Sequence, residues 1–303
     1  MGDTLDKTIL SNYDVGTVES VHRLSGGVEN TNFRITCVDS EYVLRIYNDE
    51  HSIRGARSMG SIESELGFVM ACKGVVPVAA PISNSLGHFV SRLPGKGFCA
   101  LFAFVKGESV KAFDQQVVKE YAAVLDGLYE VSLNFKTSDR EFRYDIISRA
   151  LATSGSFESD IPGVQRLVEK LVDKVGTLKS GLQDLPAGLV HGDIKLANTL
   201  FDHGRLTALL DFDDCRYSYL LEDTVMTIMH NLDQKDLNLL RSGYLETMLG
   251  SIANPKLIRD AQTSLRALIQ ARLLYDICKY ARKDQTKLDE ILDDPHVAPF
   301  LTD

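Results

Sequence analysis

The pattern of hydrophobic and polar residues changes about one third of the way along the chain. Up to residue 105, short apolar runs rich in β-branched and aromatic residues predict strands at 15–24, 33–38, 42–47 and 100–105. Further on, apolar residues recur at helical spacing over 117–131, 164–178, 224–232, 237–249 and 257–281. The pattern predicts an α+β protein with a sheet-rich domain at 1–106 and a mostly helical domain at 107–303.

A polar motif lies in the second domain. Residues 191–198 read His-Gly-Asp-Ile-Lys-Leu-Ala-Asn, which matches the protein-kinase catalytic loop H-R-D-L-x-x-x-N with Gly192 in place of arginine. In that pattern the aspartate orients the acceptor hydroxyl and the asparagine holds a metal ion. We therefore predict Asp193 and Lys195 as catalytic residues, with Lys195 balancing charge on the phosphoryl group, and Asn198 as a metal ligand.

A second acidic motif follows the first. Asp211-Phe212-Asp213 comes directly after the apolar run 206–210 and differs from the kinase D-F-G motif only in its last residue. Residues 202–205 are rich in turn formers, so 199–201 and 206–210 predict a short hairpin that brings both motifs to one edge. Asp211 is thus the second predicted ligand of Mg²⁺.

A glycine-containing turn joins the first two predicted strands. Ser25, Gly26, Gly27 and Asn30 belong to this turn, and paired glycines let the backbone approach a phosphate closely. An ordinary hairpin turn is the alternative interpretation. We predict these four residues as part of a nucleotide-binding loop.

Taken with Asp211-Phe212-Asp213, the His191-Gly192-Asp193 tripeptide resembles the aminoglycoside phosphotransferase and choline kinase superfamily of small-molecule kinases. The resemblance implies a protein-kinase-like fold with two lobes: an antiparallel sheet with one helix, and a larger helical lobe. It also implies ATP and Mg²⁺ as cofactors, and a nucleotide and a small-molecule hydroxyl substrate as partners.

The resemblance assigns further residues to the nucleotide site. Arg45, on the predicted strand 42–47, stands where the superfamily has the lysine or arginine that faces the phosphates, and arginine is the usual occupant in choline kinases. Glu63 is the expected partner of Arg45, with Glu65 as its rival. Phe104 and Val105 lie where the link between the lobes would contact adenine, although an interior strand is an alternative there.

One local similarity points to the chemical class of the phosphate acceptor. Residues 26–33 resemble the G-V-E-N-x-N-F signature of type II homoserine kinases, so homoserine or another amino alcohol is the leading hypothesis. Choline or ethanolamine, an aminoglycoside and a sugar stay open, although the lack of tryptophan weighs against an aromatic cage for a quaternary ammonium. Asp213 and Tyr217 are predicted to face the acceptor. The alternatives are a solvated loop position for Asp213 and simple packing for Tyr217.

A different class of function is a catalytically silent, nucleotide-binding pseudokinase. Against it, Asp193, Asn198, Asp211 and Arg45 are all present in this chain. Loss of one such residue is the expected mark of an inactive relative. The sequence therefore favours an active kinase.

Composition and charge exclude several other classes. A net charge of −9 and a pI near 5.3 argue against non-specific binding to nucleic acid or to a membrane surface. No stretch is long and apolar enough to cross a membrane. Residues 1–10 lack the features of a secretory signal and five cysteines are scattered without metal-ligand spacing, so we expect a cytoplasmic protein. A monomer and a homodimer both agree with the sequence.

Overall fold

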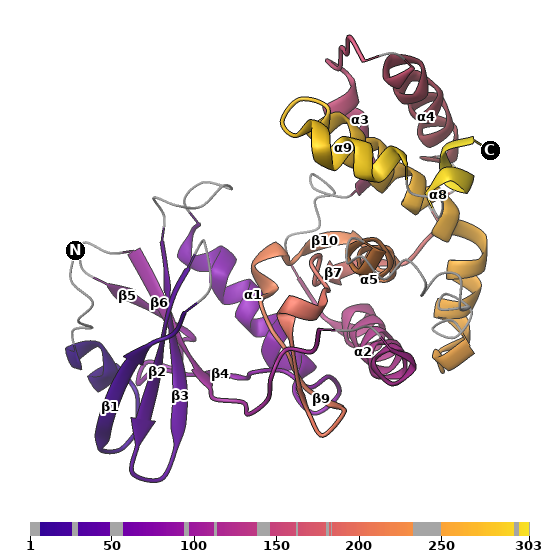
Figure 1. Ribbon diagram of the computed structural model, residues 1–303. Helices are drawn as coiled ribbons and strands as arrows, with labels where there is room; N and C mark the ends of the chain where they lie inside the picture. Colours follow the sequence, from indigo (N-terminus) through magenta and orange to yellow (C-terminus); the bar gives the residue numbers. More distant parts are fainter. Residues whose placement is uncertain are drawn as a thin grey trace. The chain divides into compact units, whose positions relative to one another are not determined.

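The computed structural model describes residues 7–25, 30–48, 57–93, 97–111, 114–137, 146–161, 163–179, 182, 184–232, 250–293 and 297–302. The chain forms two compact units, and Figure 1 shows the elements of each. The first unit comprises Met1–Glu108 with Leu200–Asp202 and Leu206–Leu210. The second comprises Ser109–Thr199, His203–Arg205 and Asp211–Asp303.

An antiparallel sheet dominates the first unit. Its strands are β1 (Val18–Arg23), β2 (Asn30–Cys37), β3 (Glu41–Tyr47), β4 (Pro81–Ile82), β5 (Val90–Leu93) and β6 (Gly97–Ala103). They are ordered β1-β2-β3-β6-β4, and β5 also pairs with β6. The runs predicted at 15–24, 33–38, 42–47 and 100–105 therefore form strands, each with shifted ends.

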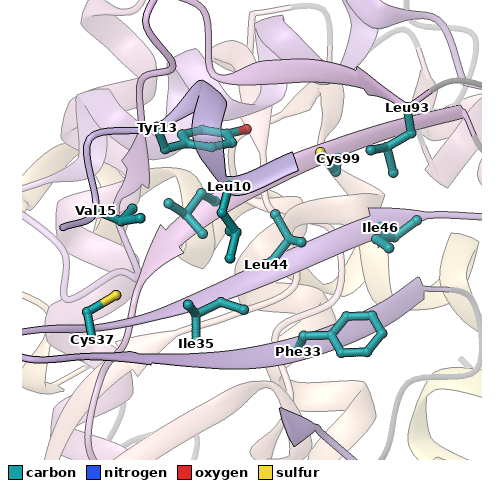
Figure 2. Packing of buried hydrophobic residues seen from close by; sticks show 11 residues of the cluster. Leu10, Tyr13, Val15, Phe33, Ile35, Cys37, Leu44, Ile46, Leu93 and Cys99 are labelled. Carbon is teal, nitrogen blue, oxygen red and sulfur yellow. The ribbon is translucent and has the colours of Figure 1, made fainter. Parts of the chain in front are cut away.

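The two faces of this sheet carry separate apolar clusters. On one face, side chains from β2, β3 and β6 pack with Leu10 of the short 3₁₀ helix η1 (Lys7–Asn12), as Figure 2 shows. On the other face, Ile62 and Leu66 of helix α1 (Met59–Cys72) pack with Tyr47. Each fully buried leucine or isoleucine contributes about 1.5–3 kcal/mol. The helix thus holds one sheet face away from water.

A short hairpin follows in sequence and is counted largely with the first unit. It consists of β8 (Thr199–Asp202) and β9 (Arg205–Leu209). His203 and Gly204 form the turn with φ angles of 48° and 78°, as two-residue turns of the I′ type require. The hairpin predicted between the two polar motifs is confirmed.

The segment 104–108 is bonded to this hairpin. Glu108 and Phe201 exchange two backbone hydrogen bonds of 2.9 and 2.8 Å, and the Thr207 hydroxyl donates to the Lys106 carbonyl at 2.9 Å. Gly107 lies between these bonds with φ +151°, where a Cβ atom would stand 2.7 Å from Thr207 Oγ1 and 2.9 Å from Leu200 Cβ. Only glycine allows the backbone to approach the hairpin this closely.

Helices make up most of the second unit, as predicted. They are α2 (Gln115–Asn134), α3 (Ile146–Ser154), α4 (Val164–Lys179), α5 (Glu222–Leu232), α8 (Pro255–Tyr280), α9 (Gln285–Leu292) and α10 (Ala298–Thr302). α8 contacts α3, α4, α5, α9 and α10 (Figure 1). The predicted helix at 237–249 lies outside the described residues, and α3, α9 and α10 were not predicted. Within the described ranges, every helix is too short or too polar to cross a bilayer.

A two-stranded ribbon accompanies these helices. It pairs β7 (Ala187–Val190) with β10 (Arg216–Tyr219) in antiparallel register, with Val190 opposite Arg216. Two 3₁₀ helices belong to the flanking loops: η3 (Leu196–Asn198) and η4 (Phe212–Asp214). The register places the loop after β7 and the loop before β10 at the same end of the ribbon.

We predict that Gly107→Ala lowers the free energy of unfolding by about 2–4 kcal/mol, because the new methyl group overlaps the hairpin and the backbone angle is strained. Gly87→Ala is the matched control, since Gly87 also has a positive φ but no atom lies within 4 Å of its would-be Cβ. The control should lose only about 1–2 kcal/mol. Urea unfolding midpoints measure both, and equal losses would refute the close-approach argument.

Candidate active site

The two predicted motifs lie together at the end of the β7–β10 ribbon. The ring centroids of His191 and Phe212 are 4.4 Å apart, and a Cβ on Gly192 would lie 2.7 Å from the Asp214 carbonyl oxygen. The His-Gly-Asp loop and the Asp-Phe-Asp loop are therefore in direct contact. Residues about twenty positions apart in sequence meet because the β8–β9 hairpin returns the chain to its starting edge.

Asp193 is held by two donors from its own loop. Its Oδ2 accepts a hydrogen bond from Lys195 Nζ at 2.6 Å and another from Asn198 Nδ2 at 2.9 Å. The side chain remains 15% exposed. Hydrogen bonds to a charged group are among the stronger ones in proteins, so this carboxylate has a defined orientation. A fixed, accessible carboxylate is what acceptor activation needs.

Asn198 is oriented by the same contacts. Its Nδ2 donates to both the carboxylate and the backbone carbonyl of Asp193, the latter at 2.9 Å, and the side chain is buried. Because both donated bonds come from the nitrogen, the Oδ1 atom is the one available to a cation. Amide and carboxylate oxygens are the ligands that Mg²⁺ prefers.

Asp211 has an unusual backbone conformation. Its φ and ψ are both 64°, in the left-handed region, and it immediately precedes η4. Aspartate tolerates this region better than most residues, but the conformation still costs about 1–3 kcal/mol and is typical of functional sites. The turn places the Asp211 carboxylate in the loop that contacts the His-Gly-Asp motif.

Asn198 and Asp211 are the residues of this site that could hold Mg²⁺. The described part of the chain contains no group of three or more His, Cys, Asp or Glu side chains suited to a metal ion. Mg²⁺ is usually bound through one or two protein oxygens together with substrate phosphates and water. The assignment of Asn198 and Asp211 as such ligands stays a prediction.

A buried carboxylate supports the loop from behind. Asp223 accepts hydrogen bonds from the backbone amides of His191 and Gly192 at 2.9 and 2.8 Å. The amide of Asp193 donates to His191 Nδ1 at 3.2 Å, and the His191 side chain has no exposed surface. Burial raises the pKa of the Asp223 carboxyl, while the electrostatic interaction with His191 and the two amide bonds oppose that rise.

The position of the Arg216 side chain explains why residue 192 is a glycine. The φ of Gly192 is +81°, and a Cβ there would lie 1.9 Å from Arg216 Nη1. The Arg216 guanidinium forms a buried ion pair with Glu222, and Nη1 donates to the Asp214 carbonyl at 2.8 Å. Burial alone lowers the pKa of Arg216, but the charge of Glu222 outweighs it and the pKa is raised. The arginine of this site thus comes from β10, in the space that Gly192 leaves.

Sequence reasoning did not find two members of this network, Arg216 and Ser218. The Ser218 hydroxyl donates to Glu222 and is fully buried. Both residues are on β10, where alternate side chains share a face. The available signal was the alternation of polar residues at 216 and 218 directly before an acidic pair at 222 and 223.

In the first unit, Arg45 projects from the sheet face that α1 covers. It is paired in register with Asn32 on β2 and Ala100 on β6, and two positions before Tyr47. Its Nε donates to Asn32 Oδ1 at 3.3 Å, and its guanidinium lies 5.7 Å from the centroid of the Phe102 ring. Arg45 is therefore an inward-facing cation rather than one extended into solvent.

The predicted glycine-containing loop is described only at its ends. Gly26 and Gly27 lie outside the described residues. Asn30 begins β2 opposite Tyr47, on the same face as Arg45. Ser25 is the last described residue before the loop. The phosphate-binding role of these four residues stays a prediction.

The predicted pair between Glu63 and Arg45 is not formed by these two described side chains. Glu63 instead accepts hydrogen bonds from the amides of Phe89 and Val90, at 3.3 and 2.9 Å, at the start of β5. The rival Glu65 is 5% exposed and forms an ion pair with Arg57. Glu65 is thus the more deeply buried of the two α1 glutamates.

The helical period explains why Glu65 is the more deeply buried of the two. Ile62, Leu66 and Val69 are spaced at one and two turns and are all buried. Glu65 falls within that face, three residues after Ile62, whereas Glu63 is rotated away from Ile62 by about 100°. The same spacing was visible in the sequence.

Phe104 and Val105 lie in the coil between β6 and Glu108, and both are half-buried. The Phe104 amide donates to the Glu41 carbonyl at 3.1 Å, and the Arg34 guanidinium lies 4.3 Å from the centroid of the Phe104 ring. The Phe104 amide therefore already has a partner in the sheet. Adenine contact by this segment stays a prediction.

Asp213 and Tyr217 are both partly exposed. Asp213 belongs to η4, and Tyr217 lies on β10 opposite Leu189. Their proximity to Asp211 in the chain agrees with a place beside the phosphoryl-transfer centre. Contact with an acceptor stays a prediction for both.

Comparison with known proteins identifies the class. The sequence profile of the phosphotransferase enzyme family matches residues 20–256. This match spans more than half of the chain, which therefore belongs to that family of enzymes.

Curated relatives are distant. A homoserine kinase of Gluconobacter oxydans is 25% identical over 217 residues, covering 69% of this chain and 65% of that protein. A homoserine kinase of Neisseria meningitidis is 25% identical over 248 residues, covering 78% of this chain and 76% of that protein. The chain spans about two thirds of the length of the Gluconobacter relative.

Solved structures show the same fold. The amicoumacin kinase hAmiN, in complex with AMP-PNP, Ca²⁺ and Ami, superposes with a TM-score of 0.65 at 16% identity, covering 98% of this chain and 95% of that one. A microcompartment-associated aminopropanol kinase gives 0.67 at 17% identity, covering 97% and 94%. The predicted kinase-like α+β fold is confirmed over nearly the whole chain.

We predict that Asp223→Asn lowers the free energy of unfolding by about 1–3 kcal/mol, because the amide NH₂ cannot accept from the second backbone N–H. Turnover should fall as well, since the Asp193 loop loses an anchor. Asp173→Asn, on the exposed side of α4, is the matched control and should change stability by less than about 0.5 kcal/mol. Thermal unfolding midpoints measure the difference, and similar values for the two variants would contradict the anchoring role.

Proposed function

We propose that this enzyme transfers the γ-phosphoryl group of ATP to a hydroxyl group of a small molecule. The observation that carries the proposal is the Asp193 carboxylate, held by Lys195 and Asn198 in a loop that contacts the Asp211-Phe212 turn. Membership of the phosphotransferase family supports it. Solved structures of similar fold contain AMP-PNP or ADP.

In this mechanism, Asp193 orients the acceptor hydroxyl and receives its proton as the new oxygen–phosphorus bond forms. The bond between the γ-phosphorus and the β,γ-bridging oxygen breaks, and ADP leaves with the electron pair. Lys195 and Arg45 supply positive charge to the phosphoryl group and to the remaining phosphates. Asp223 has no contact with the reacting atoms in this scheme and positions the loop.

Asn198 Oδ1 and the Asp211 carboxylate are the proposed ligands of Mg²⁺. When bound, the ion neutralises phosphate charge and favours departure of ADP. Asn198 thus has two roles in this proposal: its Nδ2 atom orients Asp193, and its Oδ1 atom binds the ion.

Homoserine or another amino alcohol is the leading acceptor. The curated relatives carry the name homoserine kinase at about 25% identity, and the similarity of 26–33 to the type II homoserine kinase signature points the same way. Choline or ethanolamine, aminoglycosides and sugars are the alternatives. A silent nucleotide-binding protein is disfavoured because the hydrogen bonds that orient Asp193 are all in place.

We expect Asp193→Asn to reduce turnover by about 10²- to 10⁴-fold, because the carboxamide cannot accept the hydroxyl proton. ATP affinity should stay within about twofold of the parent value, since Asp193 interacts with the acceptor. Coupled ADP release is measured with homoserine, choline, ethanolamine, aminoglycosides and hexosamines as acceptors, and ATP binding by calorimetry. Unchanged turnover in the variant would overturn the assignment.

Asp211→Asn should weaken Mg²⁺-dependent ATP binding by about tenfold or more, because a charged oxygen ligand is lost. Asparagine tolerates the left-handed backbone, so the melting temperature should remain close to the parent value. Asp202→Asn, in the exposed part of β8, is the control. Calorimetric titrations with and without Mg²⁺ separate the metal contribution, and equal Mg²⁺ dependence in all three proteins would rule out Asp211 as a ligand.

A further inference from the structure

A cluster of charged side chains surrounds one tyrosine in the second unit, away from the Asp193 loop itself. Arg149 Cζ lies 4.7 Å, Arg272 Cζ 6.0 Å and Lys279 Nζ 5.9 Å from the centroid of the Tyr275 ring. Among the described residues, Asp276 is the acid paired with this group, through Arg272 Nε at 2.6 Å. We call these five residues the Tyr275 cluster.

The cluster carries excess positive charge. Three cations face one carboxylate, so the group has a formal charge of +2. Burial by itself lowers the pKa of Arg272, but the charges of Asp276 and Glu222 outweigh it and raise that pKa. Arg272 therefore stays charged, and Glu222 is already engaged by Arg216. Like charges gathered around one ring favour a bound anion.

Asp276 adds a second, independent indication. Its residue is 6% exposed, one oxygen accepts from Arg272, and Oδ1 has no hydrogen-bond partner in the described structure. A buried carboxylate oxygen without a partner is costly, by about 1–3 kcal/mol or more. A bound donor, such as an ammonium group, would satisfy this atom.

The cluster is connected to the support of the catalytic loop. Arg272 Nη1 lies 2.8 Å from Met226 Sδ on α5. Met226 comes one helical turn after Glu222 and three residues after Asp223, which anchors the His191 and Gly192 amides. Arg149 is contributed by α3, and its Nη2 donates to the Tyr275 hydroxyl at 3.0 Å. Helix α8, which carries four of the five residues, therefore packs directly on the loop-anchoring helix α5, and α3 reaches the cluster through its contact with α8.

We propose that the Tyr275 cluster binds the α-amino-acid end of the acceptor, with Arg149, Arg272 and Lys279 facing its carboxylate and Asp276 Oδ1 accepting from its ammonium. This inference rests on the proposed phosphoryl transfer and names the substrate class for it. A hydroxyl-bearing amino acid supplies both charges at one carbon atom. Choline, ethanolamine and aminoglycosides carry only positive charge and would be repelled.

Structural roles for the same residues make different predictions. The Arg272–Asp276 pair spans one turn of α8, and Lys279 lies in the last turn, where a cation interacts favourably with the helix dipole. Loss of a purely structural role would lower the stability of the protein and reduce activity on every substrate equally. A binding role affects only acceptors that carry a carboxylate.

The experiment compares matched acceptor pairs that differ only in the carboxylate: homoserine with 3-aminopropan-1-ol, serine with ethanolamine, and threonine with 1-aminopropan-2-ol. We expect at least one amino acid to exceed its decarboxylated partner in kcat/KM by about 100-fold or more. Arg149→Gln and Lys279→Gln should each raise KM for that amino acid by about tenfold or more, with little change in kcat. The paired amine should be unaffected.

Arg266→Gln is the matched control, because Arg266 also lies on α8 and stands over an aromatic ring, 5.3 Å from the centroid of Phe300. It should leave the kinetics of both acceptors unchanged. At position 272 the charge-conserving variant Arg272→Lys is used, because Arg272→Gln would leave Asp276 buried without its charged partner. Thermal unfolding of each variant identifies any loss that comes from misfolding.

Three results would overturn the inference: no amino acid preferred over its amine partner, equal effects on both members of a pair, or effects matched by Arg266→Gln. If wild-type enzyme phosphorylates only amines or sugars, this inference fails while the proposed function stands. If no acceptor consumes ATP and calorimetry detects no amino-acid binding, both fail. Amino-acid binding that depends on Arg149 and Lys279 without turnover would support the site and contradict the proposed reaction.

Discussion

The buried carboxylate of Asp223 is the contact on which the rest of the site depends. It accepts the amides of His191 and Gly192 and so joins the first turn of α5 to the loop that carries Asp193. A buried backbone N–H group needs a hydrogen-bond acceptor inside the protein, and Asp223 supplies one to each of these two amides. The position of the reactive carboxylate is therefore set by a residue that has no contact with substrate in the proposed mechanism.

Two glycines show how close backbone approach builds the architecture around this contact. Gly192 leaves room for the guanidinium of Arg216, and Gly107 lets the coil after β6 bond to the β8–β9 hairpin. In each case the space that a Cβ would fill is occupied by a neighbouring group from a distant segment. The protein-kinase pattern has arginine at the position of Gly192, and here a guanidinium from β10 lies beside that position.

Charge is distributed differently in the two functional regions of the second unit. In the loop after β7, the Asp193 carboxylate is paired with a cation, Lys195, and the nearby Asp211 is the carboxylate that we propose binds Mg²⁺. Around Tyr275, cations outnumber acids. Both regions are tied to α5, one through Asp223 and the other through Met226. A single helix thus connects the loop that carries Asp193 with the cluster that we propose selects the acceptor.

Sequence by itself determined the fold class, the β8–β9 hairpin and the pairing of the Asp193 and Asp211 motifs, because strand and helix periods and turn residues are local properties of the chain. Helical spacing also separates Glu65, which lies on the buried face of α1, from Glu63. Only the tertiary structure decided that Arg216 fills the space above Gly192, that Glu63 bonds to the start of β5, and that Arg149 meets Tyr275. These contacts join segments from 24 to 126 residues apart, and no local pattern records which distant side chains will share a site.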